Sequence, residues 1–487
     1  MTVINEHTYR QTKIIATLGP STSSRKIIEG LIDAGVDLVR LNFSHGDRKS
    51  HIERAKLVRQ IAEEKHYHVG IVGDLQGPKI RITRFKDSKI ILKNGSTFTI
   101  DESHPENEGN EEIIGTTYKN LSQEVKLDDL LLLDDGRIEL KVEKIVNTQI
   151  ITKVIHGGLL YSSKGVNKKG GGLSASAISD KDLNDIEVAA EIGVDYLAVS
   201  FVREAKDIIR ARELLRETGN NGGIIAKIER SEALENIDEI IDAADAIMIA
   251  RGDLGVEIGD AQLPAVQKNL IKKARKKDKV VITATQMMES MITNSIPTRA
   301  EVFDVANAVI DGTDAVMLSS ETAMGDHPVE AIEAMSRICI GSEGHSPISI
   351  KGINYSIENI KVDRAIAMAC MLTADNLNAV AIAALTESGS TALWMSRINH
   401  SVPIFALTTH TGTLRKVTLY RGVYPARIKT IETTHETVNK DAINVLTELG
   451  IAKENDLVII TKGDLAGIAG GTNAMKVVKV GHLAEDK

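Results

Sequence analysis

Eight short apolar runs constrain the fold of this chain more than any other feature. Each is too short and too uniformly apolar to be a surface helix, so we predict eight strands buried on both faces, as in a parallel sheet. Helix-patterned segments follow most of them, which favours a closed (β/α)8 TIM barrel over an open doubly wound sheet. The runs are Lys13 to Leu18, Val36 to Phe43, Val69 to Leu75, Val194 to Phe201, Ile224 to Ile228, Ala246 to Ala250, Val280 to Ala284 and Ala315 to Leu318. The helical segments are Lys26 to Ala34, Ser50 to Lys65, Lys181 to Ile192, Ala205 to Glu217, Pro264 to Lys277 and Arg299 to Ile310.

Residues 222 to 259 contain two of these runs and the charged residues that follow them. Lys227 and Glu229 are two positions apart on an extended backbone, so their side chains point to the same side. Asp253 follows the next strand in a Gly-flanked turn. Two carboxylates beside an ammonium at the carboxyl ends of neighbouring strands suit a divalent metal together with an anion.

The helix between these two strands is predicted to begin with Ser231 as its cap. Its apolar positions Leu234, Ile237 and Ile241 are spaced for one buried stripe. The segment therefore completes one strand, helix and strand unit.

Between the third and fourth runs the pattern changes to hairpin signals. Lys-Asn-Gly-Ser at 93–96 follows KIIL, and Asp-Asp-Gly at 134–136 stands between LLL and the alternating RIELKV. We therefore predict a small all-β domain, a small β-barrel, inserted in a loop of the TIM barrel. Glycine-rich stretches near both joints, 77–78 and 170–172, would let it swing as a lid over the barrel mouth.

The C-terminal part is predicted to be a separate α/β domain. Residues 341–354, GSEGHSPISIKGIN, are typical of a linker, and a helix is expected near Val362 to Asn376. Strands are expected at Ala379 to Ala384, Pro403 to Leu407 and Asp456 to Ile460. The predicted domains are the first part of the barrel at 1–77, the lid at 78–171, the second part of the barrel at 172–344 and the C-terminal domain at 345–487.

Composition limits the compartment and the class of partner. The chain has two cysteines, Cys339 and Cys370, so we expect no disulfide framework. We expect a reducing, cytoplasmic compartment for the same reason. The formal charge of −8 is mild for 487 residues, and no basic or aromatic cluster predicts binding to nucleic acid. No apolar run reaches the length of a membrane span, and the N-terminus lacks the apolar core of a signal peptide.

Polar residues follow most of the strands, and a barrel active site requires polar groups from several separate strands. Arg40 would either clamp a phosphoryl group or form a structural ion pair. Residues 250–255, ARGDLG, provide closely spaced backbone N–H groups for an anion. Thr285 would either offer its hydroxyl to the site or cap a helix. The predicted mouth consists of Arg40, Asn42, Ser44, Asp74, Lys227, Glu229, Arg251, Asp253, Thr285, Gln286, Ser319, Ser320 and Glu321.

Six motifs together resemble the pyruvate kinase family. They are VRLNFSHG (39–46), GDLQGPKIR (73–81), AKIER (226–230), ARGDLGVEIG (250–259), ATQMMESM (284–291) and DAVMLSSETA (314–323). The resemblance runs from about Thr12 to the C-terminus, and each motif falls on a strand end where we predict chemistry. It implies transfer of the phosphoryl group of phosphoenolpyruvate to ADP, giving pyruvate and ATP in glycolysis.

The resemblance also implies roles for residues at the mouth. Glu229 and Asp253 would hold the divalent metal, Mg²⁺ or Mn²⁺. Lys227 would stabilise charge on the transferring phosphoryl group and on the enolate, and Arg40 would clamp the phosphoryl group. Thr285 would lie beside the enolate carbon, while the group that delivers the proton is left open.

Further positions would contact substrate carboxylate and nucleotide by the same resemblance. The backbone of Arg251, Gly252 and Asp253 would seat the substrate carboxylate. Asn42, His45 and Arg81 would contact the nucleotide, Arg81 as the lid closes.

Two stretches depart from the commonest family pattern. Relatives that need a monovalent cation typically carry Glu at the place of Lys79 and Thr at the place of Leu75, so this chain resembles the potassium-independent subgroup. A tethered ammonium would replace the charge of potassium, and K⁺ is therefore not expected to be required. The second departure is at 167–177, where many relatives have a Leu-Pro hinge; it concerns the stiffness of the lid. The positions that resemble the cation site are Asn42, Ser44, Asp74 and Leu75.

In the C-terminal domain, TESGST (386–391) follows a strand and resembles the family's effector loop, and GDLAGIAGGTN (463–473) follows another strand. Small residues, hydroxyls and a helix start would form a phosphate cradle for an allosteric sugar phosphate or AMP, unless this is an ordinary loop. The resemblance also implies a homotetramer. The expected effector contacts are Thr386, Ser388, Gly389, Ser390 and Thr391.

Two other interpretations stay open. Another metal-dependent barrel enzyme that handles enolpyruvate or pyruvate would lack the inserted lid and the GDLQGPKIR joint. A catalytically silent paralogue that senses metabolites would often have lost a charge at the mouth, yet the predicted catalytic and metal-binding residues are all in place.

Overall fold

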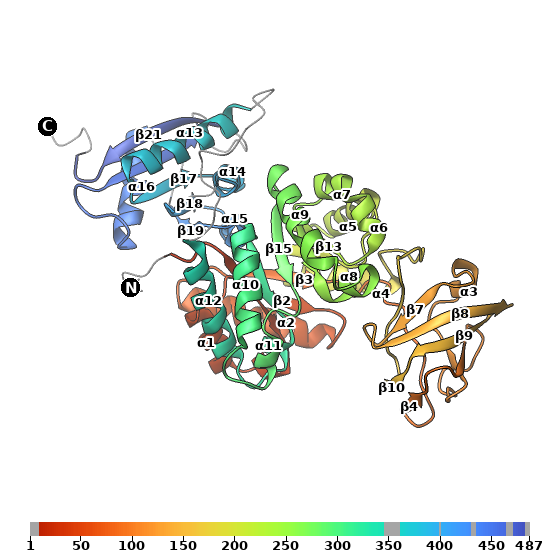
Figure 1. The fold of residues 1–487 in the computed structure, drawn as a ribbon. Helices are drawn as coiled ribbons and strands as arrows, with labels where there is room; N and C mark the ends of the chain where they lie inside the picture. Colours follow the sequence, from red (N-terminus) through yellow and green to blue (C-terminus); the bar gives the residue numbers. More distant parts are fainter. Residues whose placement is uncertain (1–8, 345–360, 399–400, 430–434, 464–470, 483–487) are drawn as a thin grey trace.

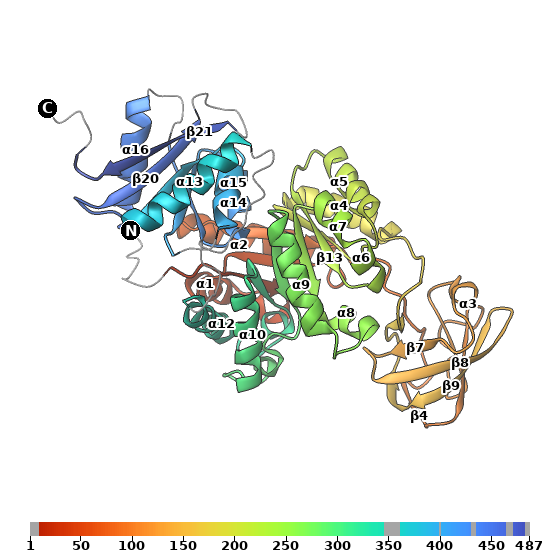
Figure 2. The ribbon, with the colours of Figure 1, turned by 45° about the horizontal axis from the view of Figure 1, so that its top comes forward.

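Three bodies lie in a row, with a closed barrel between a β-sheet lid and a C-terminal α/β domain (Figures 1 and 2). This computed structural model describes residues 9–344, 361–398, 401–429, 435–463 and 471–482. The lid and the C-terminal domain lie on opposite sides of the barrel in both views. The predicted architecture is therefore confirmed.

All eight predicted strands form the barrel, in the spatial order β1-β16-β15-β14-β13-β12-β3-β2 and with parallel pairing throughout. Four of them, β1, β14, β15 and β16, coincide with the predicted bounds. The strands are β1 (Lys13–Leu18), β2 (Leu38–Asn42), β3 (Gly70–Asp74), β12 (Tyr196–Val199), β13 (Gly223–Ile228), β14 (Ala246–Ala250), β15 (Val280–Ala284) and β16 (Ala315–Leu318).

Alternation along β13 explains how a lysine comes to the barrel mouth. Ile224, Ala226 and Ile228 pack against the surrounding helices, whereas Ile225 belongs to the cluster that fills the barrel interior. Since side chains two apart share a face, Lys227 follows Ile225 on the inner side, one step nearer the carboxyl end. The same hydrophobic pattern that closes the barrel thus aims a charged group at its mouth.

Helices surround the barrel close to their predicted bounds, with two corrections in residues 222–259. The predicted cap at Ser231 is wrong: Arg230 holds the cap position, and the Ser231 hydroxyl turns to the carboxylates of Glu232 and Glu257 instead. Asp253 lies in the first turn of a helix rather than in a turn, because Arg251 is anchored by tertiary contacts that override the low helix propensity of glycine. The elements are η1 (Pro20–Thr22), α1 (Arg25–Asp33), α2 (Arg48–Glu64), α4 (Asp180–Ile192), α5 (Ala205–Glu217), α6 (Ser231–Glu235), α7 (Ile237–Ala243), α8 (Arg251–Ile258), α9 (Leu263–Lys276), η2 (Glu289–Ile292), α10 (Arg299–Asp311), α11 (Ser320–Ala323) and α12 (Pro328–Glu343).

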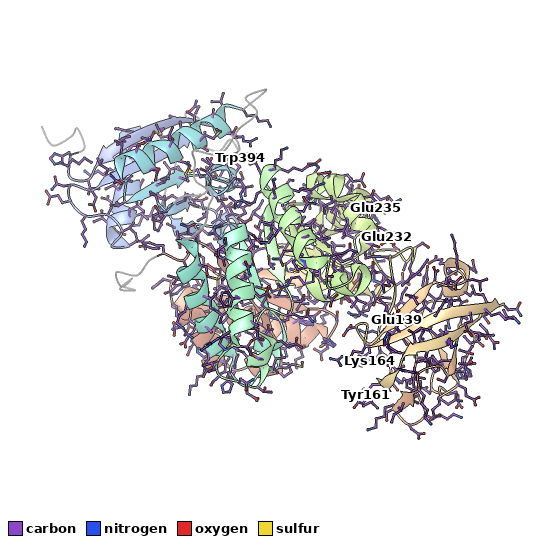
Figure 3. The ribbon with its side chains drawn as sticks, in the orientation of Figure 1. Glu139, Tyr161, Lys164, Glu232, Glu235 and Trp394 are labelled. Atoms are coloured by element: carbon purple, nitrogen blue, oxygen red, sulfur yellow. The ribbon has the colours of Figure 1, made fainter. Side chains whose placement is uncertain are left out.

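The inserted lid consists of a curled six-stranded sheet and a two-stranded sheet around its own apolar core. The hairpin predicted at 134–136 is confirmed, since β7 and β8 pair antiparallel across it. The hairpin at 93–96 is wrong: the turn forms, but β4 pairs with β10 and β5 pairs with β9 and β6. The elements are β4 (Lys89–Leu92), β5 (Thr97–Asp101), β6 (Ile113–Gly115), α3 (Leu121–Glu124), β7 (Leu130–Leu133), β8 (Ile138–Val146), β9 (Gln149–His156), β10 (Gly158–Tyr161) and β11 (Val166–Lys168). Figure 3 shows Glu139, Tyr161 and Lys164 on the side of the lid toward the barrel, and Glu232 and Glu235 on the barrel.

The C-terminal domain is a five-stranded sheet in the order β19-β18-β17-β20-β21, in which β19 and β21 are strands that the sequence did not predict. Its helices include α14, which carries Trp394 (Figure 3). Most of the predicted linker, and 464–470 of the second glycine-rich loop, lie outside the described residues. The elements are α13 (Val362–Leu377), β17 (Ala381–Leu385), α14 (Ser390–Ser396), β18 (Ile404–Thr408), α15 (Thr411–Lys416), η4 (Val417–Leu419), β19 (Val423–Arg427), α16 (His435–Glu448), β20 (Leu457–Gly463) and β21 (Thr472–Lys479).

Buried charges join this domain to the amino end of the barrel. The Arg397 guanidinium pairs with Asp314, which precedes β16, and both side chains are almost fully buried. Arg415 pairs with Asp195, which precedes β12. Because these contacts use the amino ends of the strands, the carboxyl ends remain available to the lid and to the predicted site. Over the described part of the chain, no helix combines the length and apolar character needed to cross a bilayer.

Candidate active site

Lys227 is the centre of a buried ionic cluster at the barrel mouth. Its Nζ donates to the Ser200 hydroxyl at 2.6 Å and lies 2.9 Å from Glu229 Oε1 and 3.3 Å from Asp74 Oδ1. Burial alone would lower the pKa of Lys227, but the carboxylates of Asp74 and Glu229 outweigh it and hold the pKa above its ordinary value. The ammonium therefore stays charged although the side chain is only 11% exposed.

Arg40 completes the cluster from the strand on the far side of Asp74. Its Nε donates to Asp74 Oδ2 at 2.6 Å, and its Nη1 donates to the Thr17 hydroxyl at 3.1 Å. Burial would raise the pKa of Asp74, but the charges of Lys227 and Arg40 keep it below its ordinary value. An ionised aspartate thus holds two cations side by side, and Arg40 does form the ion pair that we weighed against a substrate contact.

Glu229 and Asp253 are the two carboxylates predicted to hold a metal. Glu229 Oε2 accepts the Phe201 N–H at 2.7 Å, and Asp253 Oδ1 lies 3.1 Å from Lys79 Nζ. Burial raises the pKa of Glu229, and the nearby charge of Asp253 raises it further. Lys227 lowers it, but by less, so the pKa lies above its ordinary value. Two carboxylates that repel each other in a buried site suit a divalent cation, which favours hard oxygen ligands. Within the described residues, no cluster of three or more His, Cys, Asp and Glu ligands forms a metal site, so substrate or water oxygens would complete this one.

The first turn of α8 faces Thr285. The Gly252 N–H donates to the Thr285 hydroxyl at 2.8 Å, so this hydroxyl contacts the helix that also carries Asp253. The Arg251 side chain points elsewhere, to the carbonyls of Thr285 and Gln286 and to Asp304 at 2.7 Å, which leaves only its backbone for an anion. Thr285 and Gln286 have φ of +66° and +53°, a conformation that costs free energy in residues other than glycine.

Several predicted residues lie apart from this cluster. Arg81 donates through Nη1 to the Ser163 carbonyl within the lid, at 2.9 Å, and the His45 side chain is exposed. Asn42 Oδ1 accepts the Ser44 N–H at 3.1 Å. Lys79, expected near the cation-site positions, pairs with Asp253 instead. Asn42 and Asp74 are paired in the register of β2 and β3, so two of the predicted cation-site residues are adjacent.

Ser200 and Thr17 also contact the cluster, although neither was among the predicted site residues. The Ser200 hydroxyl accepts from Lys227 and donates to the Leu75 carbonyl at 2.8 Å, and the side chain is buried. The Ser200 hydroxyl therefore holds the Lys227 ammonium in place. It also hydrogen-bonds the carbonyl of Leu75, which is one of the predicted cation-site residues. Both residues stand near the end of a predicted strand, which was the only available signal.

The predicted effector loop begins directly after β17. The Thr386 hydroxyl accepts the Gly389 N–H at 2.9 Å, and Gly389 has φ of +85° at the start of α14. Ser388 and Ser390 place their hydroxyls 3.1 Å apart, and the Thr391 hydroxyl lies 2.6 Å from that of Thr472. The loop therefore brings the five predicted residues together, with His410 and Glu387 paired at its side.

Family models match both large domains of the chain. The model of the pyruvate kinase barrel domain matches residues 9–332, and that of the pyruvate kinase alpha/beta domain matches residues 364–478. The chain belongs to the pyruvate kinase family.

Relatives support this membership over nearly the whole length. The pyruvate kinase of Buchnera aphidicola subsp. Baizongia pistaciae is 51% identical over 476 residues, covering 97% of this chain and 99% of the relative. Pyruvate kinase II of Salmonella typhimurium is 49% identical over 479 residues, with the same coverage. The pyruvate kinase of Haemophilus influenzae is 50% identical over 458 residues, covering 93% of this chain and 96% of the relative.

Pyruvate kinases are phosphotransferases, so the prediction of an enzyme of this class is confirmed. Membership in the pyruvate kinase family supports a role in glycolysis and gives no support to a catalytically silent paralogue.

Proposed function

We propose that this chain transfers the phosphoryl group of phosphoenolpyruvate to ADP, giving pyruvate and ATP. The observation that carries the proposal is the ionic cluster of Arg40, Asp74, Lys227 and Glu229 at the mouth of a pyruvate kinase barrel. Two fixed cations beside the carboxylates are suited to a phosphoryl group in transfer, which needs positioning and electrostatic stabilisation more than covalent chemistry.

The roles proposed for the residues follow from their contacts. Lys227, locked by Ser200 and Glu229, offers a fixed positive charge to the phosphoryl group and to the enolate. Arg40 is oriented by Asp74 and Thr17 to hold the phosphoryl group from the other side. The backbone of Arg251, Gly252 and Asp253 at the start of α8 would seat the substrate carboxylate beside Thr285.

Glu229 and Asp253 would hold Mg²⁺ or Mn²⁺. When bound, the ion would neutralise charge on the enolpyruvate and phosphoryl oxygens. Without it the two carboxylates repel each other, and Lys227 and Lys79 compensate for part of their charge. Asn42, His45 and Arg81 are proposed to contact the nucleotide once the lid approaches the barrel. Arg81 would then leave its present contact with the Ser163 carbonyl.

We further propose that the enzyme does not require K⁺. Support comes from the Leu75 carbonyl, which accepts from Ser200, and from the Asp74 carboxylate, which is paired with Arg40 and Lys227. Lys79 adds a tethered positive charge at the mouth, although its present partner is Asp253, at 3.1 Å, and not one of the predicted cation-site residues. The oxygens of the predicted cation site are thus already engaged by positive or hydrogen-bonding groups.

The C-terminal loop 386–391 is proposed to bind a phosphorylated effector, a sugar phosphate or AMP. Its clustered hydroxyls and the positive φ of Gly389 support this. We also propose a homotetramer in the cytoplasm. Exposed apolar side chains on the barrel, Ile296 and Phe303 at 70% each, and on α13, Val362 at 65%, support contacts through both domains. The two described cysteines are free thiols, in keeping with a reducing compartment.

Lys227→Met tests the proposed activity. Loss of the fixed ammonium should lower kcat about 10³-fold, the order found when one group that stabilises transition-state charge is removed. A coupled assay of pyruvate formation measures this, with the exposed Lys206→Met as the matched control. Equal turnover of Lys227→Met and wild type, or a folded wild type without turnover, would contradict the proposal.

Lys79→Glu tests potassium independence. The wild type should keep its activity when tetramethylammonium is the only monovalent cation. Lys79→Glu places a further carboxylate beside Asp253, so its activity without K⁺ should fall about tenfold and recover when K⁺ is added. Lys86→Glu, an exposed lid residue, is the control. Strict potassium dependence of the wild type would reject the idea.

Ser390→Asp tests the effector site. In the wild type, one member of a panel of sugar phosphates and AMP should shift the phosphoenolpyruvate saturation curve by about tenfold, within the usual range of allosteric coupling. A carboxylate in the cradle should abolish that shift and leave basal kcat unchanged. Asn376→Asp, an exposed position on α13, controls for the added charge. Superimposable curves with every member of the panel would count against an effector.

A further inference from the structure

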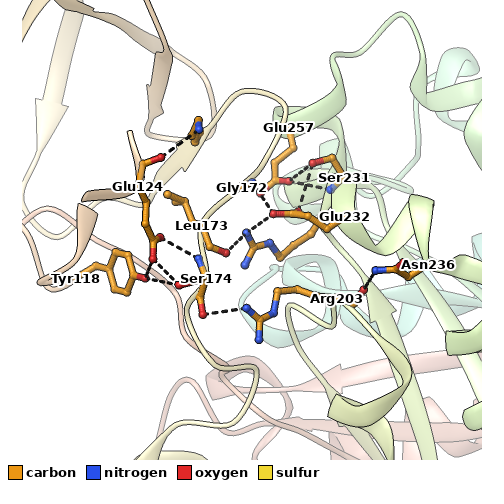
Figure 4. A network of polar contacts seen from close by, with 12 residues as sticks. Tyr118, Glu124, Gly172, Leu173, Ser174, Arg203, Ser231, Glu232, Asn236 and Glu257 are labelled. Atoms are coloured by element: carbon orange, nitrogen blue, oxygen red, sulfur yellow. Dashed lines mark hydrogen bonds and ion pairs between the residues drawn. The ribbon is translucent and has the colours of Figure 1, made fainter. Parts of the chain in front are cut away.

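The segment that leads from the lid back to the barrel is held by both bodies (Figure 4). The Leu173 side chain is buried in the core of the lid, at 5% exposed, while its carbonyl accepts the Arg230 Nη2–H of the barrel at 2.6 Å. The Ser174 N–H donates to Glu124 of the lid at 2.9 Å, and its carbonyl accepts from Arg203 of the barrel at 2.9 Å. Rotation of the lid must therefore pull on these barrel residues.

The grip on the barrel side is tight despite the glycines. Arg230 pairs with Glu232 at 2.9 Å, and the same carboxylate oxygen accepts the Gly172 N–H at 2.5 Å. Gly171 has φ of +76°, and a Cβ there would lie 2.2 Å from the Ser231 hydroxyl oxygen. The glycine-rich sequence thus permits close approach at this joint, and free swinging about residues 170–172 is not what the contacts support.

The gripping residues adjoin those that hold the metal-binding carboxylates. Arg230 directly follows Glu229. Glu257, whose carbonyl accepts the Gly170 N–H at 3.2 Å and whose carboxylate accepts the Ser231 N–H at 2.9 Å, lies one turn after Asp253 on α8. After the end of β12, the Phe201 N–H that supports Glu229 is two residues from Arg203.

Arg230 also carries a mark of constraint. It is 4% exposed, and its Nε has no hydrogen-bond partner among the described residues. A buried guanidinium with an unused donor is costly, so the contacts that Arg230 does make must offset that cost. Arg230 and Glu257 line the same hollow at the joint, together with Lys79 and Phe201.

We propose that Arg230 and Glu232 are positioning residues that couple the angle of the lid to the placement of Glu229 and Asp253. Binding of Mg²⁺ and phosphoenolpyruvate in the barrel then changes the angle of the lid. Because coupling between two sites is reciprocal, a nucleotide that contacts the lid also changes the placement of Glu229 and Asp253. The inference rests on the activity proposed above, but its principal test requires no turnover.

Spin labels report the lid directly. Cys339 and Cys370 are buried, so cysteines introduced at the exposed Lys144 on the lid and Lys272 on α9 can be labelled selectively. Double electron–electron resonance should show a distance distribution that shifts when Mg²⁺ and phosphoenolpyruvate are added. In Arg230→Met the shift should disappear and the distribution should broaden. Arg210→Met, an exposed arginine on α5, should behave as the wild type.

Kinetics provide the second measurement. Arg230→Met should raise KM for ADP about fivefold, the low end of the usual range of coupling, with a smaller change for phosphoenolpyruvate, and Arg230→Lys should recover part of it. Gly171→Ala keeps every charge but forces the segment away from Ser231, so the same changes in distance and KM are expected. It replaces Arg230→Met in both measurements if Arg230→Met does not fold. Folded variants that keep the wild-type distance shift and the wild-type KM values would overturn the proposal. Reduced thermal stability with both readouts unchanged would show a merely structural clamp and would also overturn it.

Discussion

The whole site depends on the contact of one buried ammonium with two carboxylates. Lys227 at the end of β13 is neutralised by Asp74 from β3 and by Glu229, which directly follows β13. Such charges are costly to bury singly, and removal of one partner from a buried pair typically destabilises a protein by about 3–5 kcal/mol. The cluster is therefore stable only as a unit, and Arg40, Ser200 and the Phe201 N–H hydrogen-bond Asp74 Oδ2, the Lys227 ammonium and Glu229 Oε2 respectively. A fixed array of charges of this kind is suited to phosphoryl transfer, which depends on electrostatic stabilisation.

The barrel makes this array possible because it brings together strand ends that are far apart in sequence. Its apolar alternation sets the direction of each side chain, and the C-terminal domain contacts the opposite end of the strands. The lid lies on the side of the barrel opposite the C-terminal domain. Its return segment contacts the loops that follow β12 and β13 and the end of α8, so the lid and the charged residues of the mouth share their supports.

Local patterns predicted most of the fold, because eight buried parallel strands leave a strong apolar signal of their own. They failed where a distant partner decides. The turn at 93–96 was correctly recognised, but β4 pairs with β10, which lies more than sixty residues further along the chain. Asp253 was placed in a turn because glycine disfavours helix, yet the buried side chain of Arg251 anchors the first turn of α8. Ser200 lies outside the six motifs, and its contact with Lys227 joins the ends of two strands, so no local pattern could show that its hydroxyl belongs to the site. The roles of Glu229 and Asp253, in contrast, rested on family motifs and on their positions at strand ends.

The most direct test of the account is the binding of Mn²⁺ to the purified chain, followed by electron paramagnetic resonance in the presence of phosphoenolpyruvate. If Glu229 and Asp253 share one ion, the wild type binds one Mn²⁺ per chain at this site, and Glu229→Gln and Asp253→Asn each weaken it by about 100-fold or more, at least the cost of losing an outer-shell partner of a metal ligand. The double variant should bind Mn²⁺ more weakly than either single one, and the exposed Glu213→Gln should bind as the wild type does. Unchanged affinity in either single variant would show that the carboxylates do not act on one ion.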